Sequence, residues 1–310
     1  MVVRVGCCGF PVSRERYRRV FDLVEINATF YRYPRDSLLE KWRKEAPENF
    51  EFTVKAHQDI SHKHRMETSA GCLNAFKRMV DICHVLGARI LLIQTPASFK
   101  PTSENLERLE EFFCTIDRGG LTVVWESRGR DWENPSVRVE LAKVLSEADV
   151  SHVTDPLRVM PAHTGGIAYF RLHGLGARMY YYQYNRNEME SLVERIRPLE
   201  NSGKEVYVLF NNLSMWEDGR RLIKYLREGD FSGLRGEAGL DSVRGLLTKT
   251  GFPITRSRLS RSVGWRLIDL GDGREVRLDE LLAKTSSRVY RSIEELIEEI
   301  QKGLDDSNRL

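Results

Sequence analysis

Short apolar segments recur along the first 230 or so residues, and helical spacing of apolar residues fills most of the gaps between them. The segments are rich in valine, isoleucine and leucine, which is typical of buried strands. They lie at residues 2–5, 23–26, 50–54, 89–93, 121–125, 150–154, 167–170 and 206–210. This alternation predicts an α/β fold, a (β/α)8 TIM-like barrel. A doubly wound sheet is the alternative, but no Gly-x-Gly-x-x-Gly turn follows any of these segments.

Polar side chains stand at the end of nearly every predicted strand. The carboxyl ends of parallel strands meet at one mouth of a barrel, so these side chains form a ring there, and that ring is the predicted active site. Its members are Glu25, Asn27, Lys55, Gln94, Glu126, Asp155, Arg171, His173 and Asn211. Lys55 shares a strand face with Thr53, and a lysine in that place binds an anion or, if desolvated, acts as a nucleophile. A solvated lysine at a strand end is the alternative interpretation.

Composition narrows the setting of the barrel. With 310 residues, 41% of them apolar, the chain can bury one large core and a smaller one. No apolar run approaches 18 residues, so no membrane segment is expected. Five cysteines without C-x-x-C spacing indicate a reduced, cytoplasmic protein. Cys7 and Cys8 are interpreted as packing residues, with a functional thiol as the alternative.

The pattern changes after about residue 230. Gly233, Gly236 and Gly239 indicate a linker between a barrel domain of residues 1–232 and a small basic module of residues 240–310. The module is predicted to contain a hairpin around residues 271–273 and helices at 278–282 and 292–300. Six basic residues and no acidic ones lie between residues 244 and 266. They form either a solvated face or a nucleic-acid clamp, whose arms would be Lys249, Arg256, Arg258 and Arg261.

Several of these residues form longer motifs. They include Gly6-x-x-Gly9, Val24-Glu-Ile-Asn-x-Thr-Phe-Tyr-Arg-x-Pro34, Glu126-x-Arg128, Arg171-x-His173-Gly174 and Phe210-Asn-Asn212. Over about residues 2–228 the chain resembles the YecE-like family, domain of unknown function 72. The resemblance implies a TIM barrel. It also implies site positions at Glu25, Asn27, Tyr31, Lys55, His62, Gln94, Glu126, Arg128, Arg171, His173, Asn211 and Asn212.

The first functional hypothesis is an enzyme on nucleic acid, most simply a nuclease that cleaves phosphodiester bonds in single-stranded DNA or RNA. Glu25, Lys55, Glu126 and His173 would be catalytic. Glu25, Glu126, Asp155 and His173 could hold a divalent metal ion, Mg or Mn. Lys55, Arg128 and Arg171 could hold the phosphate, and Tyr182 with its neighbouring tyrosines could stack bases or pack over the barrel mouth. The full substrate-binding set would be Asn27, Tyr31, His62, Gln94, Arg128, Arg171, Tyr182, Asn211 and Asn212.

Two other hypotheses remain open. The first is a lyase or isomerase acting on a phosphorylated sugar, in which Lys55 forms a Schiff base and Glu126 or His173 carries the proton. The second is a barrel that binds nucleic acid without catalysis. The sequence leaves the oligomeric state open.

Overall fold

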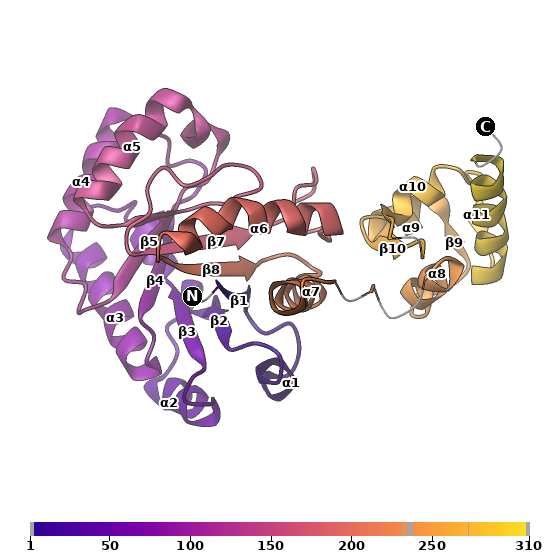
Figure 1. Ribbon diagram of the computed structural model, residues 1–310. Helices are drawn as coiled ribbons and strands as arrows, with labels where there is room; N and C mark the ends of the chain where they lie inside the picture. The colour runs from indigo at the N-terminus through magenta and orange to yellow at the C-terminus, as the bar shows by residue number, and fades with distance from the viewer. Residues whose placement is uncertain (1–2, 232, 235–237, 272, 308–310) are drawn as a thin grey trace. The chain divides into compact units, whose positions relative to one another are not determined.

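Eight parallel strands form one continuous sheet in the computed structural model, which describes residues 3–231, 233–234, 238–271 and 273–307. The strand order is β6-β5-β4-β3-β2-β1-β8-β7. The two edge strands meet through a parallel bridge between Thr154 and Phe170, and the Arg171 amide donates to the Thr154 carbonyl at 3.1 Å. The sheet is therefore a nearly closed barrel, which confirms the predicted TIM-like fold (Figure 1).

The strands begin and end close to the predicted segments, and several continue through the polar residue that follows the apolar run. They are β1 (Val3–Cys8), β2 (Leu23–Ile26), β3 (Glu51–Lys55), β4 (Ile90–Gln94), β5 (Thr122–Glu126), β6 (Ser151–Val153), β7 (Ile167–Leu172) and β8 (Glu205–Phe210). The extension has a physical reason. The neighbouring strand still offers ladder partners at that point, so Gln94 pairs in register with Glu126, and Lys55 with Leu92.

Helices connect the strands, and in Figure 1 α2 to α5 surround the barrel on the outside. The helices that follow the barrel strands in the sequence are α1 (Arg14–Arg18), α2 (Asp36–Glu45), α3 (Ala70–Leu86), α4 (Ser103–Thr115), α5 (Pro135–Glu147), α6 (Arg186–Asn201) and α7 (Met215–Glu228). Shorter turns are η1 (Ala28–Phe30), η2 (Asp59–Lys63) and η3 (Arg130–Glu133). The N-cap residue of α4 is Thr102, whose hydroxyl accepts a hydrogen bond from the Asn105 amide at 3.2 Å. None of the helices in the described residues is both long enough and apolar enough to cross a membrane.

The interior of the barrel is apolar below the mouth. Leu92, Val124 and Tyr169 belong to one buried cluster, and each lies two residues before a polar side chain of the predicted ring. Because strand side chains alternate, each apolar residue and the polar residue after it share the inward face. All five cysteines are free, and Cys114 alone among them is exposed.

The chain divides into two compact units. One contains Met1–His173 with Leu192–Asn211, and the other contains Gly174–Ser191 with Asn212–Leu310. The second unit therefore includes the segment after β7 and helix α7 as well as the predicted C-terminal module. Gly236 of the predicted linker and residue 272 at the centre of the predicted turn lie outside the described residues.

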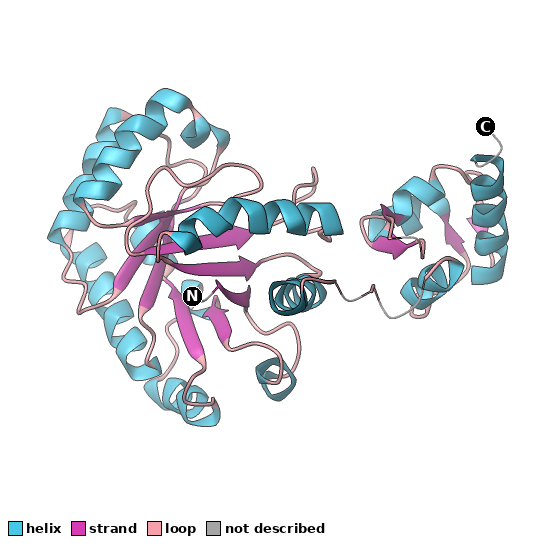
Figure 2. Ribbon diagram, viewed as in Figure 1, coloured by secondary structure: helices cyan, strands magenta, loops and turns pink. Residues whose placement is uncertain are grey.

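The C-terminal part of the second unit has short antiparallel pairs among small helices (Figure 2). Its elements are α8 (Leu240–Leu247), β9 (Ile254–Thr255), α9 (Arg256–Val263), β10 (Leu267–Asp269), β11 (Glu275–Arg277), α10 (Leu278–Leu282), β12 (Val289–Tyr290) and α11 (Ile293–Ser307). β10 and β11 form the predicted hairpin, with Ile268 paired to Val276. Val243, Leu259, Ile268, Leu278 and Leu296 are buried in a core of its own, so this part has an apolar interior to stabilise it.

Candidate functional site

Arg171 lies at the centre of the polar ring. Its side chain is 1% exposed, and its guanidinium donates from Nη2 to Glu25 Oε1 at 2.8 Å and from Nη1 to Glu126 Oε2. Nη2 also lies 3.5 Å from Asn27 Oδ1. Strands β2, β5 and β7 therefore bring four of the predicted site residues together. Glu25, Arg171 and Glu126 are called the triad below.

Arg171 and Glu126 of the triad are ionised in spite of their burial. Burial alone would lower the pKa of Arg171, but Cys8, Glu126 and Glu25 raise it well above its usual range. Burial would likewise raise the pKa of Glu126, yet Arg128 and Arg171 hold it at about 2. A buried charge is tolerated only when paired and hydrogen-bonded, and the triad meets that condition.

Three side chains below the triad were not predicted as site residues. Tyr169 donates its hydroxyl to Glu25 Oε2 at 2.9 Å, and that hydroxyl is also 2.8 Å from Thr53 Oγ1. Cys8 pairs in register with Glu25, and burial raises the pKa of its thiol against the opposing effect of Arg171. The sequence carried a signal for Tyr169, because it lies two residues before Arg171 and so shares its strand face.

Arg128 joins Glu126 to His173 at the mouth. Its Nη2 is 3.0 Å from Glu126 Oε1 and 2.8 Å from His173 Nε2. Burial and then Arg128 lower the pKa of His173 well below its usual value. The imidazole is therefore neutral at physiological pH, and it is a weak base while Arg128 lies against its Nε2.

Lys55 forms the wall of the site next to the triad. It is 9% exposed, donates to Gln94 Oε1 at 2.8 Å, and its ammonium lies 4.1 Å from the centre of the Phe30 ring. Burial and then Arg171 lower the pKa of Lys55 to about 8. The His62 ring also packs against Phe30, edge-to-face, with the two ring centres 4.9 Å apart. Tyr31, which also contacts Phe30, is 70% exposed at the rim.

The predicted metal ligands are not gathered into one cluster. Glu25 and Glu126 are bonded to Arg171, and Asp155 Oδ1 accepts from the Leu157 amide at 3.0 Å. Across residues 3–231 and the other described ranges, no group of three or more His, Cys, Asp or Glu side chains could hold a metal ion. Carboxylates already neutralised by a guanidinium do not fit a Mg or Mn centre, which needs their charge.

The remaining predicted binding residues lie elsewhere. Asn211 is half-buried at the end of β8, where its amide donates to the Leu172 carbonyl at 2.8 Å. Tyr182 and Asn212 belong to the second unit, where Asn212 Nδ2 donates to the Tyr182 carbonyl at 2.8 Å. Tyr182 is 7% exposed, and the Arg277 guanidinium lies 4.1 Å from its ring centre. Tyr182 is therefore buried within the second unit, and both of its predicted roles stay predictions.

The four predicted clamp residues separate into two kinds. Arg256 donates from Nη1 to the Thr285 carbonyl at 2.7 Å and joins α9 to the turn after α10. Lys249, Arg258 and Arg261 are exposed. The structure thus gives Arg256 a local bonding role and leaves the other three on the surface.

An eight-stranded parallel barrel with an ionised, buried site at its mouth defines a protein of the TIM-barrel class. Residues 13–230 match the family described as Protein of unknown function DUF72, and the chain belongs to this family. The resemblance seen in the motifs is therefore confirmed.

Relatives and solved structures agree with this assignment. The UPF0759 protein YunF of Bacillus subtilis is 28% identical over 251 residues, 71% of this chain and 88% of the relative. A DUF72 family protein of Thermotoga maritima has a TM-score of 0.62 at 24% identity, covering 74% of this chain and 100% of that one. A D-tagatose 3-epimerase-like protein has a TM-score of 0.53 at 14% identity, covering 73% of this chain and 96% of that one, and shares the fold.

Proposed function

We propose that the barrel mouth catalyses imine chemistry on a small anionic carbonyl compound, as a lyase or isomerase of a phosphorylated sugar. The observation that carries the proposal is the environment of Lys55. Its hydrogen-bond acceptor is the neutral amide of Gln94, and among the described residues it forms no ion pair. An amine in such an enclosed site is the kind that becomes a nucleophile.

The lowered pKa of Lys55 makes this chemistry feasible at neutral pH. A lysine with its ordinary pKa of 10.5 is almost entirely protonated there, whereas a pKa of about 8 leaves roughly a tenth of the molecules unprotonated at pH 7. The unprotonated fraction thus rises by a factor of roughly 300.

The proposed reaction balances with groups that the barrel contains. Nζ of unprotonated Lys55 attacks the carbonyl carbon, and the resulting carbinolamine takes up one proton from solvent and loses water to give a protonated imine. The imine nitrogen then receives the electron pair of an adjacent C–H or C–C bond, and the released proton goes to Nε2 of His173, which becomes a stronger base once the substrate's phosphate takes Arg128 from it. Glu126, with a pKa of about 2, is a weak base and positions Arg128 instead. His173 returns the proton to the enamine carbon, which restores the protonated imine, and hydrolysis of that imine by water releases the product, the lysine and one proton.

The charges at the mouth favour an anionic substrate. Among the described side chains that contact or interact electrostatically with the triad, the cations Lys55, Arg128 and Arg171 outnumber the carboxylates of Glu25 and Glu126. The Arg128 side chain is 19% exposed, so it can offer donors to a phosphate. The nuclease hypothesis stays a prediction. It is less well supported, because the carboxylates that it assigns to a metal are bonded to Arg171.

Borohydride trapping tests the proposal. The protein is incubated with a panel of phosphorylated aldoses and ketoses, reduced, and analysed by peptide mass spectrometry. We expect an adduct on Lys55 that chelator does not affect and that Lys55→Met abolishes. Lys100→Met is the matched control, because Lys100 is 53% exposed and paired with Asp131. A wild-type protein that forms no adduct with any sugar, or an adduct that survives in Lys55→Met, would contradict imine chemistry. Metal-dependent cleavage of labelled single strands would favour the nuclease instead.

A further inference from the structure

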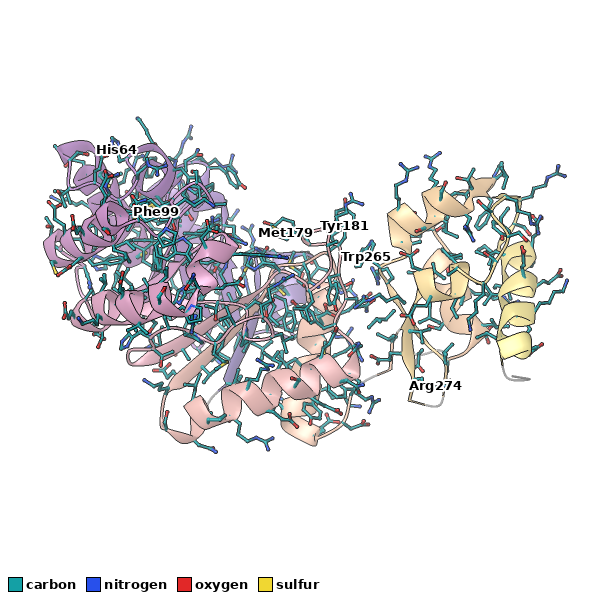
Figure 3. The ribbon with its side chains drawn as sticks, turned by 90° about the horizontal axis from the view of Figure 1, so that it is seen from above. His64, Phe99, Met179, Tyr181, Trp265 and Arg274 are labelled. Atoms are coloured by element: carbon teal, nitrogen blue, oxygen red, sulfur yellow. The ribbon has the colours of Figure 1, made fainter. Side chains whose placement is uncertain are left out.

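A basic and aromatic surface lies on the second unit, built from the segment after β7 and from α9 with the residues that follow it. It consists of Arg178, Tyr181, Arg258, Arg261 and Trp265 and is called the Tyr181 surface. Tyr181 and Trp265 lie beside each other with ring centres 6.0 Å apart and planes at 85° (Figure 3). The Arg178 guanidinium lies over the Tyr181 ring, and its Nη1 donates to the Arg261 carbonyl at 3.3 Å.

Helical spacing puts Arg258 and Arg261 on one side of α9, and Trp265 follows shortly after the end of the helix. Arg258 and Arg261 are three residues apart, and Trp265 follows four residues after Arg261. Gly264, between α9 and the tryptophan, keeps helical backbone angles, with φ −58° and ψ −26°. The Trp265 indole donates to the Ser262 carbonyl at 3.0 Å, which fixes the ring at the end of this face.

Buried hydrogen bonds hold the two segments of this surface together. Gln183 is fully buried, and its Oε1 accepts from the Leu267 amide at 3.0 Å and from Arg266 Nε at 3.2 Å. Glu217 Oε2 accepts a hydrogen bond from Arg266 Nη2 at 2.6 Å. The aromatic pair is therefore carried by a satisfied polar network, which favours a preorganised surface.

The stretch of sequence that contains α9 is basic. No acidic residue occurs from residue 242 to residue 268. Arg244 pairs with Asp241, and Arg266 pairs with Glu217. Arg258 and Arg261 are exposed and form no ion pair within the described residues. Their charges are available to a polyanion.

We infer that the Tyr181 surface binds single-stranded nucleic acid. Exposed arginines beside aromatic rings are the combination that holds an unpaired strand, because the guanidinium groups neutralise phosphates while the rings stack on bases. A duplex hides its base faces, so only the charge of the surface acts on it. This inference is independent of the imine chemistry proposed for the barrel, since the two use different residues.

Fluorescence anisotropy with the full-length protein tests the inference. The probes are labelled dT and U oligonucleotides of about 20 nucleotides, long enough for one such surface. We expect both single strands to bind more tightly than a duplex of the same length. The double variant Arg258→Gln with Arg261→Gln should weaken binding at least tenfold and reduce the slope of log affinity against log salt by about 1.4, roughly 0.7 for each lost phosphate contact. Tyr181→Ala should weaken binding by about tenfold with an unchanged salt slope.

Matched variants separate this surface from general basicity. Arg291→Gln with Lys302→Gln removes the same charge from exposed positions around α11, and Met179→Ala alters an exposed, non-aromatic neighbour in the loop. Both should bind as the wild type does. The inference is overturned if no single strand binds at about 50 mM salt, if heparin or a duplex binds equally well, or if the α11 variant loses as much affinity and salt slope as the α9 variant.

Discussion

Two arginines of the barrel each lie between two glutamates, and the two sites differ mainly in burial. Arg171, at the carboxyl ends of the strands, is 1% exposed between Glu25 and Glu126. Arg89 comes just before β4, at the other end of the barrel, and its side chain is 57% exposed. Its Nη2 lies 3.1 Å from Glu51 and 3.0 Å from Glu205.

The likeness extends to a tyrosine at each site. Tyr169 donates to Glu25, and the Tyr207 hydroxyl lies 3.0 Å from Glu51 and 2.8 Å from Glu205, so that it donates its one hydrogen to one of these two carboxylates. The two rings stack inside the barrel with centres 5.7 Å apart.

The comparison shows that composition does not decide what such a cluster does. Coulombic attraction is strong where water is excluded and weak where water screens it. In the buried site, Arg128 and Arg171 hold the pKa of Glu126 at about 2 against the effect of burial, and burial followed by repulsion from Arg171 lowers the pKa of Lys55 to about 8. The other site is a partly exposed network, in which Arg89 and Tyr207 lower the pKa of Glu205 while water screens the Arg89 guanidinium.

The largest effect is expected from Arg171→Met. It leaves Glu25 and Glu126 buried without their shared partner, and we expect the free energy of unfolding to fall by about 3–5 kcal/mol in urea titrations. A triple variant that adds Glu25→Gln and Glu126→Gln removes the uncompensated charges and should recover part of the loss. A loss below about 1 kcal/mol for Arg171→Met would mean that burial does not distinguish the two sites.

The next effect is a loss of stability at low pH. The pKa of Glu126 is lowered from 4.5 to about 2, so its stabilising contribution is present above pH 4.5 and is lost as pH falls toward 2. The shift corresponds to about 3 kcal/mol. Urea unfolding between about pH 5 and about pH 2.5 should show this loss in the wild type and a flatter profile in Glu126→Gln. Glu110→Gln, at an exposed position of α4 that forms no ion pair within the described residues, is the control and should keep the wild-type slope.

Much of the site could be predicted from the sequence, for a physical reason. The strand period of two and the parallel topology together assign the inward face and the mouth end, so Glu25, Lys55, Glu126 and Arg171 were placed correctly at one rim. Their pairing could not be predicted. Arg171 is separated by 146 residues from Glu25 and by 45 from Glu126, and only the closure of the barrel decides which side chains meet.

The exposure of side chains outside the barrel strands is less predictable from the sequence. Tyr182 has an aromatic ring of the kind that stacks on bases. The ring is buried, however, and the guanidinium of Arg277, a residue far away in the sequence, covers it. Arg256 looked like its neighbours in α9, yet its guanidinium bonds to backbone carbonyls. In both cases a tertiary partner, rather than local propensity, decides exposure, and no periodic pattern encodes that partner.

A smaller effect follows from changing the acceptor of Lys55. Gln94→Glu replaces a neutral amide by a carboxylate at 2.8 Å from Nζ, which favours the charged amine. We expect the pKa of Lys55 to rise by about one unit, so that the pH midpoint of borohydride trapping moves upward from about 8 by that amount. An unchanged or lower midpoint would show that Gln94 does not determine the charge state of Lys55. Gln94→Met is the matched variant, since it keeps the length of the side chain without adding charge.

The smallest effect is expected from Arg89→Met at the exposed site. Glu205 is 45% exposed and can be hydrated, and Glu51 keeps Arg4, whose Nε lies 3.1 Å away, as well as Tyr207. No carboxylate is left buried and unpaired, so we expect the free energy of unfolding to fall by less than about 1 kcal/mol. Because the screening length shortens from about 10 Å at 0.1 M salt to about 3 Å at 1 M, this loss should largely disappear in urea titrations at the higher salt concentration. The loss caused by Arg171→Met should persist there, since ions do not enter the closed interior. Equal salt sensitivity of the two variants would mean that water reaches Arg171, and the pKa values at the mouth would then need another cause.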